Sequence, residues 1–450
     1  MAPPYKRPPA PVAGAYPADA PPTAGEVVNA SVDWRSVFVN ADLQQLIEQA
    51  LANSRDLRSA VLRVEEARAL SGIQRADFFP DVAVVASQSR TRTPANLSPT
   101  GEANVTSAYQ LSVGVISWEL DFWGRIRSLN TAAIERYLAT DASRRAFTVS
   151  LVGQVANAWL TQKELDRRLE FARRAVAVRE ETRRIFRRRV EEGATARFDL
   201  TQVEILVTQA QALDAQLEQA RATNSHALSL LVGTPVELPP QPGALEEVPE
   251  PVRAVAAGLP SELIEMRPDI IAAEHQLRAA NANIGAARAA FFPQVTLTGN
   301  YGTASAELDD LFSAGTHAWS FAPSIVLPIF TGGRLRYNLD LSEVRSNLAV
   351  ASYELTIQTA FRDVADALSA SRWLTQQVSI QRNALTAATE RARLAQLRYD
   401  TGSSAYLEVL EAERDLLDTE QALVQAEGAA QASRVGVFTA MGGGAFGAGE

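Results

Sequence analysis

The residues whose types and spacing could do chemistry are two glutamates, Glu408 and Glu411, which follow a turn expected at Gly402. Side chains three residues apart on a helix share one face, so both carboxylates are expected to point the same way. The residues alone leave two interpretations open. One is an ordinary solvated helix face. The other is a ring of carboxylates in a symmetric oligomer, which would attract cations and set the field of a pore.

No constellation for covalent or metal chemistry accompanies these glutamates. The chain has no Cys, which excludes disulfides, thiolate metal sites and thiol nucleophiles. We interpret its three histidines, His226, His275 and His317, as structural or surface residues because they are far apart in sequence. No nucleophile motif or phosphate-binding glycine loop is present. We therefore expect no enzyme activity, no metal and no cofactor.

Composition narrows the class of partner. The 450 residues carry a formal net charge of -9, which argues against nucleic acid because phosphate binding needs a basic surface. No run of 18 apolar residues and no signal peptide are visible. The Pro-rich N-terminus predicts an extended segment. Both a secreted protein cut after its leader and a cytosolic chain with a disordered tail would begin in this way.

The chain consists of two similar halves. Arg189 and Gly193 return 209 residues later as Arg398 and Gly402, and the two glycines that precede them, Gly124 and Gly333, are also 209 apart. This period is too long for a solenoid repeat of about 20–50 residues. It indicates one large unit that was duplicated and fused, so Gly193 and Gly402 are expected at equivalent turns.

The same order of elements is predicted in each half. Residues 126–192 contain no proline and a single glycine, which predicts a helix about 100 Å long. The expected organisation is an extended segment 1–42; a first repeat 43–233 with a helix over 43–79, strands 81–92 and 108–122, a long helix 126–192 and a helix 198–232; a linker 234–260; a second repeat 261–444 with a helix over 261–291, strands 294–304 and 318–330, a long helix 335–401 and a helix 405–440; and a C-terminal tail 445–450.

The strands carry the membrane signal. From Trp319 to Ile329 apolar residues occupy the odd positions, a period-2 pattern of the length that crosses a bilayer. The first strand pair alternates less well, because Ile116 and Trp118 fall on the other face from Val115. Soluble sheets also alternate, so the pattern leaves both environments open. Four strands cannot close a membrane barrel, whose smallest members have about eight, so a spanning sheet would need several chains; three chains supply twelve strands.

At these residues the chain resembles the outer-membrane efflux factor family, the TolC- and OprM-like trimeric channels. The resemblance runs from about Pro4 to Gly444. Its most specific stretch runs from Arg267-Pro268-Asp269-Ile270 to Phe291-Phe292-Pro293, and Trp118-Glu119-Leu120-Asp121 with Gly124-Arg125 is a second signature. The closest likeness is to the OprM-like, lipid-anchored branch that serves multidrug pumps.

The resemblance implies a mixed α/β membrane protein with four strands per chain. These strands would form one third of a trimeric 12-strand β-barrel, which is continued by a long α-helical barrel. It implies a homotrimer in the outer membrane, contacting outer-membrane lipid, with a large periplasmic portion. The partners would be a periplasmic adaptor protein and an inner-membrane drug pump, and drugs and other small solutes would pass passively. The branch also carries an acylated Cys shortly before a segment like Pro4–Pro8, and that Cys is absent here.

The resemblance further implies a gate beside Gly402. Glu408 and Glu411 match acidic residues at the closed mouth of some members, where Asp is usual, and Leu407 matches an apolar constriction. Tyr399 and Arg414 match positions that hold neighbouring helices closed. The first half has Gln202 where the second has Glu411, so we expect the second hairpin to constrict more.

Two observations leave other interpretations open. A basic run at the first tip fits a solvated face, contact with an adaptor, or pairing with acids of a neighbouring subunit; it comprises Arg183, Arg184, Arg187, Arg188 and Arg189. The same fold also serves as an exit duct for type I protein secretion, and a soluble coiled-coil scaffold remains an alternative of a different class.

Overall fold

The computed structural model describes residues 1–16, 33–99, 101–238, 251–253 and 264–443. Most of the expected linker, the tail and the middle of the N-terminal segment lie outside this part of the chain. Among the described residues, no helix is both long enough and apolar enough to cross a membrane.

The chain divides into two compact units, and each contains segments of both repeats. The first unit comprises residues 1–9, 63–141 and 272–354, and the second comprises 10–62, 142–271 and 355–450. The sequence repeats are therefore not the compact units, because the two halves interleave to build each one.

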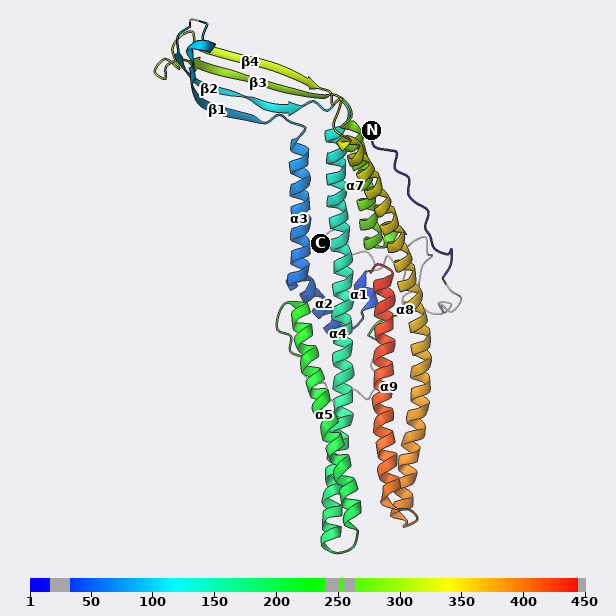
Figure 1. Cartoon of the computed structure of the whole chain (residues 1–450). Helices are drawn as coiled ribbons and strands as arrows, with labels where there is room; N and C mark the ends of the chain where they lie inside the picture. The colour runs from blue at the N-terminus through cyan, green and yellow to red at the C-terminus, as the bar shows by residue number, and fades with distance from the viewer. Residues whose placement is uncertain (17–32, 100, 239–250, 254–263, 444–450) are drawn as a thin grey trace. The chain divides into compact units, whose positions relative to one another are not determined.

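The first unit is built on a sheet of four antiparallel strands in the order β1-β2-β3-β4 (Figure 1). The strands are β1 (Val82–Thr93), β2 (Asn104–Glu119), β3 (Gln294–Ser305) and β4 (His317–Val326). Large apolar side chains stay exposed along both edge strands, including Val84 at 73% and Trp319 at 74%. A sheet with such exposed apolar side chains is typical of strands that contact lipid on one face.

The weak alternation in the first strand pair has a structural cause. Between Val115 and Trp118 the pairing of β2 with β3 shifts register. A bulge of this kind inserts extra residues into one strand and re-aims the side chains that follow. Ile116 and Trp118 therefore leave the alternation without ending the strand.

Four helices of the second unit lie side by side in the order α5-α4-α9-α8 (Figure 1). These are α4 (Arg125–Glu191), α5 (Arg197–Val232), α8 (Arg334–Asp400) and α9 (Tyr406–Ala440), of which α4 and α8 begin in the first unit. Both α4 and α8 have 67 residues. Ion pairs join neighbours in the row: Arg221 of α5 with Asp166 of α4, and Arg382 of α8 with Glu427 of α9.

The main apolar core of this unit gathers short N-terminal helices against the long ones. Helix α1 (Trp34–Val37) and helix α2 (Ala41–Asn53) bury Phe38 and Leu43 completely. Phe38 packs edge-on against Phe438 of α9, with ring centroids 5.2 Å apart. Phe38 also forms an isolated antiparallel β-bridge with Val252, so residues 251–253 of the linker join this core.

Several element boundaries differ from expectation. Strand β2, expected over 108–122, begins at Asn104 and ends at Glu119. The helix expected over 43–79 is interrupted at Ser54, whose extended backbone ends α2 and whose Oγ accepts from the Leu57 amide at 3.4 Å to start α3 (Arg55–Ala76). The helix expected over 261–291 is interrupted at Arg267, between the helical residues 264–266 and α7 (Pro268–Ala289), because a residue that precedes proline disfavours helical geometry. Strand β4 stops at Val326 rather than 330, shortly before Pro328, which cannot donate to a ladder.

Candidate gate at the helical tips

Two glycines make the tip turns that the repeat predicted. Gly193 lies between α4 and α5 with φ 72°, and Gly402 lies between α8 and α9 with φ 73°. This left-handed conformation is free of strain only for glycine. Each turn reverses the chain within a few residues, so the residues on both sides of it meet across a hairpin.

At the second hairpin the first acidic candidate is already paired. Arg398 of α8 donates from Nη1 to Glu408 Oε1 at 2.6 Å, so one carboxylate holds the two helices of the hairpin together. Glu411, one turn further along α9, is exposed, and Leu407 is 46% exposed. The two glutamates are therefore not equivalent: Glu408 is engaged within its own chain, whereas Glu411 remains open to solvent.

An aromatic cluster joins the first hairpin to the second. Arg189 of α4 donates from Nη1 to the Tyr399 hydroxyl of α8, and its guanidinium lies 6.0 Å from the centre of the Tyr399 ring. Tyr399 meets Tyr406 of α9 edge-on at 4.8 Å, and Phe186 of α4 lies 4.7 Å from Tyr406. The Tyr406 hydroxyl also reaches Thr182 Oγ1 at 3.2 Å. We call these five residues the tip clamp.

Of the tip clamp, the sequence analysis proposed a role for Tyr399 alone, and that role stays a prediction. Tyr399 was expected to hold helices closed, and it does contact two of them. Arg189 was noted only as a repeat marker and as part of the basic run. Its partner lies 210 residues away, so only the repeat, which places both tips at one level, could have suggested the contact.

Arg414 and the basic run make other contacts. Arg414 pairs with its neighbour Asp415 at 3.2 Å, and Arg391 of α8 pairs with the same aspartate. Arg184 pairs with Glu181 on its own helix at 2.5 Å. In the described part of the chain Arg414 therefore pairs within α9, and it is Arg391 that joins α8 to Asp415 of α9.

A partly buried acid lies behind the tip, where α4 meets α9. Burial raises the pKa of Glu413, and the nearby Arg179 guanidinium opposes this effect. Arg179 is 5% exposed and donates to the Leu206 carbonyl of α5 at 3.0 Å. The joint between α4 and α9 thus holds a carboxyl group that ionises less readily than a solvent-exposed glutamate.

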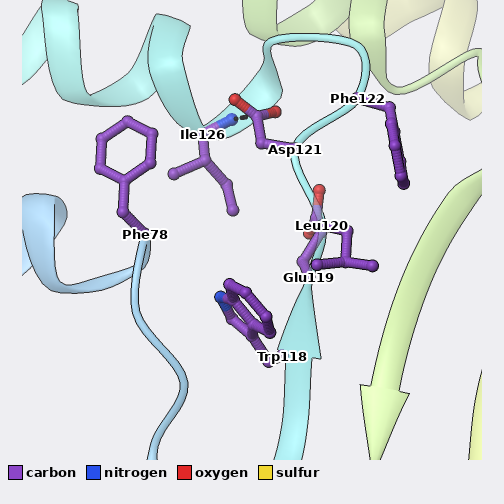
Figure 2. Close-up of a pocket in the computed structure, with 7 residues that line it drawn as sticks. All are labelled: Phe78, Trp118, Glu119, Leu120, Asp121, Phe122 and Ile126. Atoms are coloured by element: carbon purple, nitrogen blue, oxygen red, sulfur yellow. Dashed lines mark hydrogen bonds between the residues drawn. The ribbon is translucent and has the colours of Figure 1, made fainter.

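A second feature lies at the end of β2, at the sequence signature Trp118–Arg125. Glu119 accepts two bonds from Arg125 at 2.8 and 2.6 Å, and Asp121 accepts from the first amides of α4, those of Ile126 and Arg127, at 3.1 and 2.9 Å. Glu119, Asp121 and Ile126 line a cavity of about 230 Å³ together with Phe78 and Trp118 (Figure 2). The signature is explained by the connection between β2 and α4: Asp121 caps the first turn of the helix, and the pair of Glu119 with Arg125 ties that turn to the strand.

Among the described residues, no group of three or more His, Asp or Glu side chains is placed to hold a metal ion. His275 lies beside Glu135, with Nδ1 2.6 Å from Oε2. The site is thus a set of charged and aromatic contacts between helices.

Comparison with known proteins identifies the family. The sequence matches the family described as outer membrane efflux protein over residues 46–234 and 259–443. The chain belongs to this family. It is 42% identical to the outer membrane protein OprJ of Pseudomonas aeruginosa over 444 residues, which cover 99% of this chain and 92% of that protein. It is 41% identical to the toluene efflux pump outer membrane protein TtgC of Pseudomonas putida over 449 residues, with the same coverage.

Solved structures of family members have the same fold. A membrane protein from Pseudomonas aeruginosa superimposes with a TM-score of 0.92 at 41% identity, covering 99% of this chain and 97% of that one. The open state of the Neisseria gonorrhoeae outer membrane channel MtrE superimposes with a TM-score of 0.88 at 37% identity, covering 99% and 98%. The predicted family and the fold of four antiparallel strands with long helices are confirmed. The protein is an outer-membrane efflux channel and not an enzyme.

Proposed function

We propose that three copies of this chain form one exit duct of a tripartite efflux pump. Each would contribute four strands to a closed twelve-strand barrel and four helices to a tube. A periplasmic adaptor and an inner-membrane pump would deliver the solutes. The relatives' names, which include antibiotic, solvent and toluene efflux pumps, support small and largely apolar cargo.

One observation carries this proposal: the sheet is open. In the described chain β1 and β4 are each paired on one side only, and exposed apolar residues lie along both strands. Backbone groups left unpaired in hydrocarbon cost several kcal/mol each, roughly, so a spanning sheet must close on itself. Three copies satisfy both edges of every sheet.

The tip residues would then act as the gate. We propose that Glu411 and Leu407 of the three copies constrict the mouth, while Tyr399, Arg414 and the Arg398–Glu408 pair hold the hairpins in place. Gly193 and Gly402 permit the turns at the tip. Because Gln202 stands in the first repeat where Glu411 stands in the second, the second hairpin supplies the charge and constricts more.

Mass and conductance test the proposal together. Protein purified in detergent should have the mass of three chains, and in a planar bilayer it should conduct ions with a preference for cations. Expression beside a cognate pump should lower the accumulation of a small apolar drug. A monomer that does not partition into membranes would refute the duct. An acylated Cys ahead of Pro4 in the native protein belongs to the same proposal, and mass spectrometry of the native N-terminus tests it.

A further inference from the structure

The strand pairing separates the sheet into an apolar face and a polar face. Because successive side chains of a strand point to opposite faces, residues paired across the strands form rows on one face. One row holds apolar and aromatic side chains: Val84, Val113, Tyr301 and Trp319. A neighbouring row on the opposite face holds small or polar ones: Ala83, Gly114, Asn300 and Ser320. In a membrane-spanning barrel the first face contacts lipid and the second lines the channel, so we call the first the lipid face.

Two arginines lie on the lipid face, both at the same end of β1. Arg90 and Arg92 are an even number of residues from Val84, so their side chains leave the strand on the same face. Besides Glu119, they are the only Asp, Glu, Lys or Arg residues in the four strands. Glu119 lies at the other end of the sheet, where the helices attach (Figure 1), and it is paired with Arg125. The hairpin end of the lipid face therefore carries two positive charges and no acid within the strands.

The arginines lie at the height where an apolar band of ordinary size ends. On the lipid face of β3, ten residue steps separate Val295 from Ser305, which is about 34 Å along the strand. A tilt of about 45° makes this roughly 24 Å along the membrane normal, and the apolar band of outer-membrane barrels is about 25 Å tall. Ser305 shares its row with Gln88 of β1. Arg90 and Arg92 follow Gln88 along the strand, so they lie about 5 and 10 Å beyond the band.

Neither guanidinium is neutralised within the described part of the chain. Both side chains are exposed, and neither forms an ion pair with another described residue. The acids at this end of the sheet lie in the two hairpins rather than in the strands: Glu102, Glu307, Asp309 and Asp310. A lipid-facing charge is costly at the bilayer midplane but costs little near the edge. The two arginines are thus placed where lipid head groups begin.

The chemistry of the pair favours phosphate. A guanidinium binds a phosphate group through two parallel hydrogen bonds, a geometry that a lysine ammonium does not reproduce. Arg90 and Arg92 leave one face of β1 about 7 Å apart, so each can contact a phosphate of its own. Ser107, which pairs with Arg90 across the strands, adds a hydroxyl donor on the same face. Towards the middle of the sheet, the exposed side chains of Val84 and Val113 offer an apolar surface to acyl chains.

We propose that Arg90 and Arg92 bind the two phosphate groups of lipid A, the bisphosphorylated acyl disaccharide that anchors lipopolysaccharide in the outer leaflet. Its acyl chains lie along the apolar rows of the lipid face. The proposal rests on the proposed function, because it requires that the sheet spans the outer membrane with its hairpins outside. An assembled duct carries three such sites, one on each copy.

Lipid binding to the full chain tests the proposal. Wild type and the double variant Arg90→Gln with Arg92→Gln are purified in detergent, their native masses are measured, and each is titrated with bisphosphorylated lipid A. The matched control, Arg334→Gln with Arg336→Gln, removes two exposed arginines with the same spacing at the helix end of the sheet. Lipid A from which both phosphates have been removed is the control ligand.

The Arg90 and Arg92 double variant should bind bisphosphorylated lipid A at least tenfold more weakly than wild type, and the control variant should change the affinity less than twofold. All three proteins should bind the phosphate-free lipid equally. Particles with the mass of three chains in which the two double variants bind bisphosphorylated lipid A equally would overturn the site while the duct stands. A monomeric wild-type particle would instead overturn the duct, and the site with it.

Two further variants separate phosphate recognition from its alternatives. Arg90→Lys with Arg92→Lys keeps both charges but loses the two-bond geometry, so it should bind about threefold more weakly than wild type. Undiminished binding by this variant would show a general attraction of charge and would overturn the paired contact. Asp309→Asn with Asp310→Asn should bind at least as tightly as wild type, and a loss of binding would show that these acids hold the lipid through a bridging cation instead.

Discussion

Replacing Arg189 by alanine should loosen the tip clamp. The arginine donates to the Tyr399 hydroxyl and lies over the Phe186 and Tyr399 rings, 5.7 and 6.0 Å from their centres. A hydrogen bond from a charged group contributes about 1.5–3 kcal/mol where it is buried, and an exposed cation–π contact about 0.5–1 kcal/mol. Because Arg189 is exposed, solvent screens both contributions, and a total of about 1–2 kcal/mol is the reasonable expectation.

A loss of this size changes the balance between closed and open tips by roughly 5- to 30-fold, since about 1.4 kcal/mol corresponds to a factor of ten. The open probability of single channels in a planar bilayer measures that balance directly. The conductance of the open state should stay the same, because Arg189 contacts other helices rather than the proposed constriction.

Arg188→Ala is the matched control, because it removes the same charge from an exposed neighbour on the same helix. Tyr399→Phe keeps the ring but removes the acceptor, so combining it with Arg189→Ala should produce less than the sum of the two effects. Equal open probabilities for the Arg188 and Arg189 variants would show that the charge of the basic run matters and the clamp does not.

Three further predictions concern acidic side chains. Glu411→Gln should reduce the preference for cations about two- to fivefold and raise single-channel current, because it removes the proposed ring of charge; ion-selectivity measurements check this. Glu413→Gln should flatten the dependence of the melting temperature on pH: the pKa of Glu413 is raised in the folded protein, so its carboxyl contributes stability at low pH that is lost as pH rises through the folded pKa. Glu274→Gln should speed tryptic cleavage after Lys6 several-fold, because Glu274 accepts hydrogen bonds from Tyr5 at 3.1 Å and from Arg7 at 2.7 Å.

Each of these has a control and an outcome that would contradict it. Gln202→Ala alters the equivalent position of the first repeat and should leave selectivity unchanged; if it matters as much as Glu411→Gln, the asymmetry between repeats is wrong. Asp418→Asn alters an exposed acid of α9 and should keep the pH slope that Glu413→Gln removes. For the N-terminal segment, Glu265→Gln should leave cleavage at Lys6 at its original rate, and equal acceleration by both variants would show that Glu274 does not hold the segment.

The same Glu274 contacts predict how the N-terminal segment responds to acid. Burial opposes ionisation of Glu274, but the hydrogen bonds from Arg7 and Arg278 outweigh it and lower the pKa. Its contribution to stability is therefore present above the pKa of an unfolded glutamate and is lost as pH falls through the lower folded value.

Helices defined by long runs of helix-forming residues could be predicted from the sequence. Breaks and ends of elements that depend on a single residue could not. The run without proline between Gly124 and Gly193 predicts α4 because helix formers fill it throughout. The break at Ser54 carries no proline or glycine, so only the packed structure shows it. Likewise β4 stops near Pro328, although apolar residues continue beyond it.

The candidate site was predictable in composition but not in its contacts. The repeat and the residues after Gly402 indicated which side chains gather at the tips. The sequence could not show that Glu408 pairs with Arg398 or that Arg189 donates to Tyr399. Both contacts depend on how one long helix is rotated about its axis relative to the next. A rotation of a few tens of degrees about a helix axis changes such partners without altering any sequence pattern.

The equal length of α4 and α8 constrains how a protein of this kind can change its reach. Each has 67 residues. Two ion pairs between α4 and α9, Arg167 with Glu427 and Arg174 with Glu420, are seven residues apart on each helix. Inserting a few residues into a single helix would shift every ion pair on one side of the insertion out of register. Lengthening therefore has to proceed in whole heptads, about 10 Å at a time, and in all four helices at once. The reach of the four-helix row can thus change only in coarse increments.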